Sequence, residues 1–354
     1  MIDPPPFPSG TLSSEFSFSP EFIDRLIAEY NAARVASDKH DVWSEIAGHS
    51  EQFQKDLIAG NSSDVAGHLN SMFNTNLLIG MAHSSLLLGD GSPYAKAYFG
   101  MRVRDSLLAL AEALAIKGIE SNHQTSFDQH VQLTNGDVST LVAPIESALG
   151  HEIQVPDFGQ AAFVKVGNYH LNPDFIRHAY AMHRIAGLGF SKKDRILEIG
   201  GGFGCVARYG VLKGFEDITI VDLPFANAVQ AGFIAGTLGE DCVSFQHEKV
   251  KNGKVCVFPS TRKEELQGTF DLAINMDSLP EVNREEALAY LELLRNKARY
   301  FWSVNQEAEK TTRGGMTQNR VSQLVDEVGG FKRIHRHPYW MEQGYVEELY
   351  EIER

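Results

Sequence analysis

The chain of 354 residues has little of what marks several protein classes. Its three cysteines, Cys205, Cys242 and Cys256, show no Cys-x-x-Cys spacing, which argues against a disulfide framework or a zinc site. The N-terminus lacks the basic and apolar regions of a signal peptide. The most apolar run, 77–88, is interrupted by His83 and falls short of the roughly 20 residues of a membrane span. We therefore expect a soluble, reduced, cytoplasmic protein.

Positive charge is also scarce. The chain has 32 lysines and arginines against 46 aspartates and glutamates, which gives a formal net charge of −14. An acidic surface repels phosphate backbones, so a nucleic acid is not an expected partner. We attribute the acidity to solubility, and the length allows two domains or one enlarged domain with ample core.

A glycine turn is the most informative feature that is present. The apolar run from Arg195 to Ile199 contains Glu198 and breaks into Gly200-Gly-Gly202-Phe-Gly204. Glycines leave no side chain between backbone and ligand, so such a turn can wrap closely around a nucleoside-bearing cofactor.

The spacing within this turn separates two cofactors. A dinucleotide site needs a third small residue at position 205, where this chain has Cys205. Glu198 would repel a pyrophosphate but suits a cation. S-adenosylmethionine carries a sulfonium and an ammonium, and the pattern from Glu198 to Gly204 resembles motif I of the class I methyltransferases.

A second acid follows at the distance that nucleoside-binding sheets require. The predicted helix 205–213 leads into the alternating strand 217–222, which ends in Asp222. A carboxylate at the end of this strand can accept hydrogen bonds from both ribose hydroxyls. Enzymes that bind NAD share this acid, so Asp222 indicates a nucleoside rather than methyl transfer.

Further strands are predicted at 254–260, 270–275 and 299–304, with helices at 174–186 and 281–298 and a late strand at 331–337. This alternation predicts an α/β fold with a doubly wound, parallel, Rossmann-like sheet. Ligands bind at the carboxyl ends of such strands. We therefore expect a cofactor site that includes Glu198, Gly200, Gly202, Gly204, Asp222, Leu223, Ser260, Asn275 and Met276.

The first half of the chain has a different pattern. Residues 1–20 look like an extended arm, and 21–150 are predicted to be a helical domain with helices at 21–37, 41–59, 62–82, 93–117 and 138–149. Residues 151–190 are a connector and a helix, and 191–354 form the cofactor-binding domain. The helical domain is expected to be a cap, an acceptor-binding region or the surface of a homodimer.

Three stretches together carry a narrower resemblance. The segments 196–204, 274–281 and 166–168 resemble a group of bacterial sugar O-methyltransferases. This resemblance implies transfer of a methyl group from S-adenosylmethionine to a hydroxyl of a sugar or sugar-containing small molecule, with S-adenosylhomocysteine as product.

Candidate catalytic groups follow from this chemistry. A hydroxyl must lose its proton as it attacks, so a general base should lie near the methyl group. Asp277 is the first candidate, and His170 and Glu281 follow; capping of the next helix is the alternative for both acids. Tyr169 is expected to fold over the cofactor.

Acceptor contacts are expected at the end of the fifth strand. Asn305, Gln306 and Glu307 offer amides and a carboxylate that pair with hydroxyls.

A divalent metal ion that orients the acceptor is a less favoured alternative, and we do not predict one. Asp277, Glu281 and Glu307 could supply oxygen ligands. His335 and His337 share one face of the late strand and could ligate a metal, but we interpret them as a solvated face.

Three other functions remain open. The acceptor could be a phenol or an amine, the protein could be an NAD-dependent oxidoreductase, or it could be a binding protein that kept the fold without the reaction. The intact glycines and Asp222 argue against the last.

Overall fold

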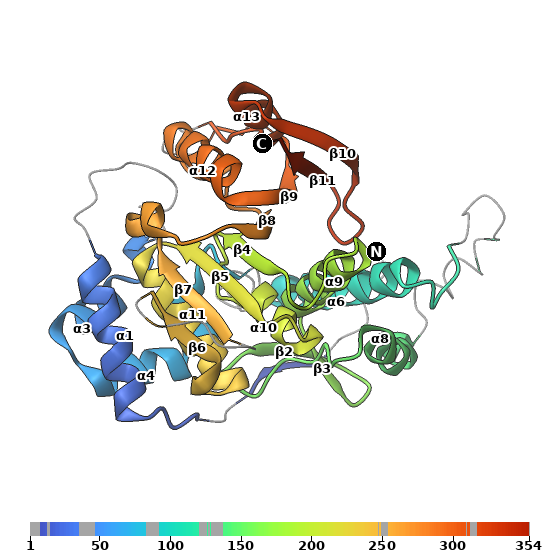
Figure 1. Ribbon diagram of the computed structural model, residues 1–354. Coiled ribbons are helices and arrows are strands. Elements are labelled where there is room, and N and C mark those ends of the chain that lie inside the picture. The colour runs from blue at the N-terminus through green and yellow to red at the C-terminus, as the bar shows by residue number, and fades with distance from the viewer. Residues whose placement is uncertain are drawn as a thin grey trace.

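The structure, a computed structural model, describes residues 8–12, 15–34, 47–82, 92–119, 126, 128, 137–246, 248, 254–308, 310–311 and 317–353. Its centre is an eight-stranded sheet with the order β10-β11-β9-β8-β4-β5-β7-β6 (Figure 1). The strands are β4 (Arg195–Ile199), β5 (Asp217–Asp222), β6 (Val243–Phe245), β7 (Lys254–Pro259), β8 (Phe270–Met276), β9 (Ala298–Gln306), β10 (Phe331–Pro338) and β11 (Tyr345–Ile352).

The expected α/β, doubly wound architecture is confirmed. Within the series β9-β8-β4-β5-β7-β6 each strand is parallel to its neighbours. Strand β11 runs antiparallel to both β9 and β10. The sequence analysis missed β6 and β11. The acidic residues of β11 concealed it, because Glu347 and Glu348 are buried rather than solvent-facing.

Helix boundaries follow capping chemistry. The cap of α9 (Pro173–Gly187) is Asn172, whose side chain accepts a hydrogen bond from the Asp174 N–H. The cap of α12 (Arg284–Lys297) is Asn283, so this helix starts three residues later than predicted. Helix α10 (Cys205–Lys213) has the predicted bounds. The other helices of this half are α11 (Pro224–Leu238), α13 (Val321–Val328), and the short η5 (Glu240–Cys242) and η6 (Ser260–Glu265).

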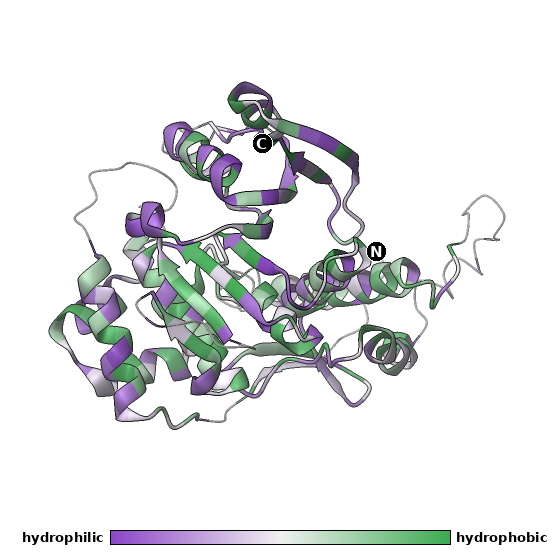
Figure 2. Ribbon diagram, in the orientation of Figure 1, coloured by the Kyte–Doolittle hydropathy of each residue, from purple (hydrophilic) through white to green (hydrophobic). Residues whose placement is uncertain are grey.

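Successive side chains of a strand point to opposite faces of the sheet, so the hydrophobic core is divided between these two faces. Ile196 packs into a cluster with residues of α9, α10 and α11, whereas Leu197 packs with residues of α12 and α13. Figure 2 shows apolar residues on the central strands and hydrophilic ones along β10 at the edge. Charge on an edge strand protects against pairing with other chains.

The N-terminal half contributes helices that pack on the α9, α10 and α11 face. They are α1 (Pro20–Ala33), α3 (Glu51–Ala59), α4 (Ser62–Asn70), η1 (Met72–Asn74), η2 (Asn76–Leu78), α6 (Pro93–Ala113), η4 (Val138–Leu141) and α8 (Val142–Leu149). Parts of two predicted helices, 35–37 and 41–46, lie outside the described residues. No helix within the described ranges is long and apolar enough to cross a bilayer.

The predicted arm and connector meet in a small sheet that the sequence analysis did not foresee. Strand β1 (Ser9–Thr11) pairs with β2 (Ala162–Val166), which pairs with β3 (Tyr169–Leu171). The predicted domain boundaries remain a prediction.

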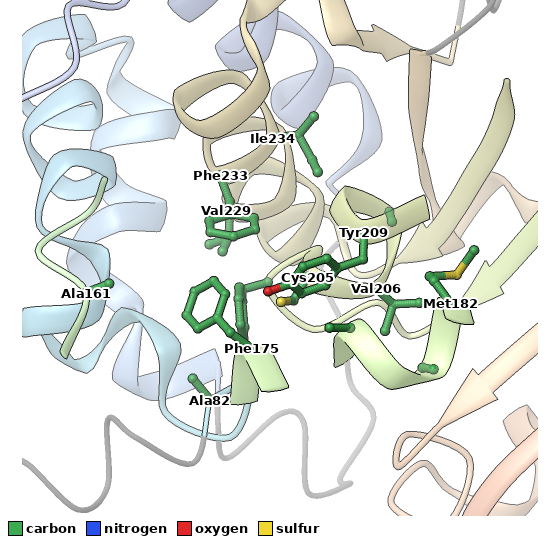
Figure 3. Close-up of a cluster of buried hydrophobic side chains, with 14 of the residues drawn as sticks. Ala82, Ala161, Phe175, Met182, Cys205, Val206, Tyr209, Val229, Phe233 and Ile234 are labelled. Atoms are coloured by element: carbon green, nitrogen blue, oxygen red, sulfur yellow. The ribbon is translucent and has the colours of Figure 1, made fainter. Parts of the chain in front are cut away.

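One hydrophobic cluster joins the N-terminal helices to the sheet. Phe73 of η1 lies 5.3 Å from Phe203 of the glycine turn, 6.1 Å from Phe175 of α9 and 6.0 Å from Phe233 of α11, between ring centroids. Figure 3 shows Phe175 and Phe233 facing one another in this cluster. The glycine turn is therefore supported by the N-terminal half.

Replacing Phe73 should destabilise the whole chain. Phe73→Ala removes a buried ring and leaves a cavity, so we expect a loss of about 3–5 kcal/mol in the free energy of unfolding, measured by urea denaturation. Phe73→Leu, the control, should lose less. If only N-terminal probes shifted while the sheet unfolded as before, the two halves would be energetically separate.

Candidate functional site

A cavity of about 1000 Å³ opens at the carboxyl ends of β4, β5, β7 and β8. It is lined by the glycine turn and by the loop after β8. The N-terminal half contributes Tyr30 of α1, Gln54 of α3 and Met81 after η2. The cavity is thus enclosed by segments distant in the sequence.

The glycine turn presents its backbone to this cavity. Gly200 and Gly202 line it, with positive φ of 69° and 55°. A Cβ at Gly200 would stand 2.2 Å from the Ser278 Oγ, so the approach of the loop after β8 demands glycine there. Gly204, also at positive φ, does not line the cavity and instead precedes the first turn of α10.

Asn275 ties the glycine turn to the loop after β8. Its side chain is fully buried and donates to the Ile199 carbonyl at 2.9 Å and to the Ser278 Oγ. Ser278 donates to the same Ile199 carbonyl at 3.1 Å. Asn275 therefore positions the site from behind and, contrary to the sequence-based expectation, does not line the cavity.

Two acids that line the cavity, Glu198 and Asp222, have no positively charged partner among the described residues. Burial, reinforced by the nearby Asp222, raises the pKa of Glu198 to about 8, and burial raises the pKa of Asp222 to about 6. Glu198 is 4% exposed, and its Oε2 has no hydrogen-bond partner among the described residues. A ligand that brings positive charge or hydroxyl donors would satisfy this pair.

Asp222 is held in place by its surroundings. Its Oδ1 accepts from the Leu223 N–H at 2.8 Å, and its Oδ2 accepts from the Gln230 amide at 2.7 Å. The same Gln230 nitrogen donates to the Gly202 carbonyl at 3.0 Å, which couples this acid to the turn. Sequence analysis gave no signal for Gln230, which lies mid-helix in α11.

Asp277 is the first residue of the loop after β8. It has a left-handed backbone, with φ of 69°, and its Oδ2 accepts from Arg177 Nη1 at 2.9 Å. Burial and the Asp277 carboxylate hold the pKa of Tyr345 well above its usual value. The buried Oδ1 of Asp277 has no partner within hydrogen-bond distance in the described part of the chain.

The remaining predicted residues divide between the cavity and other places. Leu223, Ser260, Met276 and Glu281 line it. Tyr169 and His170 do not, because β3 is part of the small sheet, where the His170 ring lies 4.0 Å from that of Phe163.

Nor do the three residues predicted to contact the acceptor line the cavity. Asn305 is buried and donates to the Asn275 and Ser303 side chains, Gln306 donates to Gln318, and Glu307 pairs with Arg336 of β10 at 2.6 Å. Since β11 pairs with β9 as far as Gln306, Tyr345 of β11 takes the cavity position instead. The acids considered for a metal are likewise not assembled, because Asp277 faces Arg177 while Glu307 faces Arg336.

Sequence analysis missed several cavity residues. Arg177 and His178 lie in the first half of α9, and both line the cavity. His178 Nε2 is 3.4 Å from Arg177 Nη2, and its ring packs edge-on against Phe203 of the glycine turn. The available signal was their position on the predicted helix 174–186, which follows the candidates Tyr169 and His170 and leads into the strand before the glycine turn.

Comparison with known proteins finds structural likeness alone. No protein-family model and no curated protein matches the chain. Among solved structures, magnesium protoporphyrin IX methyltransferase from Synechocystis PCC 6803 with bound S-adenosylmethionine is 14% identical, with a TM-score of 0.36, and the match covers 50% of this chain and 78% of that one.

Two further structures match the same share of the chain. The glycopeptide N-methyltransferase MtfA complexed with sinefungin is 12% identical, with a TM-score of 0.39, over 50% of this chain and 87% of that one. A provisionally assigned RNA methyltransferase from Pyrococcus horikoshii is 16% identical, with a TM-score of 0.37, and the match covers 51% of this chain and 83% of that one.

Proposed function

We propose that this chain is an S-adenosylmethionine-dependent methyltransferase. The observation that carries the proposal is that Glu198, Asp222, Gly200 and Gly202 line one cavity, while a buried Glu198 oxygen has no hydrogen-bond partner among the residues that the structure describes. When bound, this cofactor supplies a methyl group activated on a sulfonium. Its positive charges favour the ionised forms of Glu198 and Asp222, whose pKa values are raised by burial, whereas the charge of a pyrophosphate would disfavour them.

We infer specific tasks for the residues around the cofactor. Glu198 attracts the cationic end, and Asp222, fixed by Gln230 and the Leu223 N–H, accepts the ribose hydroxyls. Ser260, Leu223 and Met276 add contacts from the neighbouring strand ends. The Phe73 and Phe203 cluster keeps the turn rigid behind them.

The acceptor is proposed to be a hydroxyl of a sugar or sugar-containing small molecule. A cavity of this volume lies at the upper end of the range of about 300–1000 Å³ for small-molecule sites, which leaves room for an acceptor beside the cofactor. The resemblance to sugar O-methyltransferases and the polar groups of Asp277, His178 and Glu281 support a hydroxylated acceptor. A phenol or an amine is the competing outcome, tested by assaying methyl transfer to each class.

Asp277 and His178 are the two proposed proton acceptors. Asp277 lines the cavity, and Arg177 holds its carboxylate in position through the ion pair at 2.9 Å. His178 lies on the other side of Arg177 and can take the proton in its place.

S-adenosylhomocysteine should bind the purified protein in a calorimetric titration, and NAD should not. Asp222→Asn should weaken binding about 10- to 100-fold, because hydrogen bonds to a charged group are lost. Asp217→Asn is the matched control, since Asp217 begins the same strand and pairs with Arg195 at 2.9 Å. Absence of binding by the wild-type protein would refute the proposal.

Glu198→Gln should stabilise the unliganded protein while weakening cofactor binding. The folded pKa of Glu198 lies above its unfolded value of 4.5, so its contribution to stability is complete below pH 4.5 and is lost as the pH rises through about 8. Glutamine has no such penalty. At pH 8 we expect a melting temperature about 2–4 °C above wild type, and a smaller gain at pH 5. Equal melting temperatures at pH 8 would contradict the raised pKa.

Asp277→Asn should lower kcat about 10²- to 10⁴-fold, the range for loss of a general base, and change affinity for S-adenosylhomocysteine less than about threefold. Asparagine also tolerates the left-handed backbone at this position. If His178→Gln produces the large kcat loss and Asp277→Asn does not, His178 is the base. His170→Gln, outside the cavity, is the control.

A further inference from the structure

A cluster of potential metal ligands lies on the hairpin of β10 and β11, away from the cavity. His335 and His337 alternate on β10, and Glu347 stands directly opposite His337 on β11. The three donor atoms lie within 4.8 Å of one another. None of the three residues lines the cavity, and the proposed methyl transfer does not use them.

The distances suit a small ion. Glu347 Oε1 is 3.1 Å from His335 Nε2 and 3.7 Å from His337 Nε2. These values bracket the separation of about 3.3 Å between two ligands that each lie roughly 2.0–2.1 Å from a tetrahedral ion. The two imidazole rings are stacked at 4.9 Å with an interplanar angle of 13°, so both approach the carboxylate from the same side.

Burial distinguishes this cluster from an ordinary surface group. The Glu347 side chain is 1% exposed, whereas those of His335 and His337 are 23% and 42% exposed. A carboxylate withdrawn from water needs positive charge nearby. The imidazoles extend from it to the surface and leave a route by which an ion can enter.

A backbone carbonyl orients one imidazole for ligation. His337 Nδ1 is 3.0 Å from the Pro338 carbonyl oxygen, which can only accept, so this nitrogen carries the proton. In the neutral ring the Nε2 lone pair then points toward Glu347. Metal-ligating histidines are commonly fixed by such an outer hydrogen bond.

Arg184 of α9 competes for the same carboxylate. Its Nε donates to Glu347 Oε1 at 3.0 Å and to Oε2 at 3.3 Å, and its Nη2 lies 3.4 Å from His337 Nε2. Its side chain is 26% exposed and belongs to the last turn of the helix, so it can turn outward into solvent. An incoming metal ion would replace the guanidinium of Arg184 as the cation beside Glu347.

We propose that His335, His337 and Glu347 form a binding site for a divalent transition-metal ion of the zinc class. Two imidazole nitrogens and one carboxylate select zinc, cobalt or nickel over magnesium or calcium, and leave a fourth position for water. Arg184 moderates the affinity. The ion joins β10 to β11 on the strand that also carries Tyr345 into the cavity, two residues before Glu347.

The test is titration of the full chain, stripped with a chelator, with zinc at pH 7.5 by calorimetry, and with cobalt by visible absorption. One equivalent should bind. His335→Ala and His337→Ala should each weaken binding at least tenfold, and His170→Ala, a histidine outside the cluster, should leave it unchanged.

Arg184→Met is the decisive variant. If a metal competes with the guanidinium, removing Arg184 should strengthen zinc binding at least fivefold, a gain that misfolding cannot produce. If the cluster is only an ion-pair network, Arg184→Met will not raise the affinity. That result, no stoichiometric binding by wild type, or unchanged binding by the double variant His335→Ala and His337→Ala would overturn the proposal.

Discussion

The carbonyl oxygen of Ile199 accepts hydrogen bonds from both Asn275 and Ser278, and much of the cavity depends on these two contacts. They bring the loop after β8 so close to the glycine turn that position 200 has no room for a Cβ. They also fix the position of Asp277, which lies between Asn275 and Ser278 in the chain. Asp277 has a left-handed backbone there and pairs with Arg177. Both loops are therefore set by a buried polar contact rather than by the sheet alone.

The electrostatic design of the cavity trades stability for binding. Two carboxylates are desolvated in the folded chain, and Glu198 lacks a partner for one oxygen within the described structure. Burying them costs free energy that a cationic ligand with hydroxyl groups can recover. Asp277, by contrast, has a compensating positive charge in Arg177 at 2.9 Å. The site thus separates an uncompensated acidic end from a compensated one.

Local sequence patterns predicted what local physics determines. The bounds of β5 and α10, the glycine turn and the acids Glu198 and Asp222 all follow from alternation, capping and glycine geometry. Tyr30, Met81 and Tyr345 reach the cavity from distant segments, and only tertiary packing brings them there. Asn305, Gln306 and Glu307 do not line the cavity, because a position at the end of a strand does not determine the direction of the side chain. Glu307 pairs instead with Arg336, and Asn305 donates to the buried amide of Asn275.

The shared aromatic cluster limits how such a protein can diversify. Phe73 belongs to the N-terminal half, yet it packs on Phe203 of the turn and on Phe233 of α11. A chimaera that exchanged the N-terminal half for another would lose this packing beneath its own glycine turn. The lining of the cavity is therefore more readily changed by single substitutions at cavity-facing positions, such as Tyr30, Gln54 and Met81, than by exchange of the whole N-terminal half.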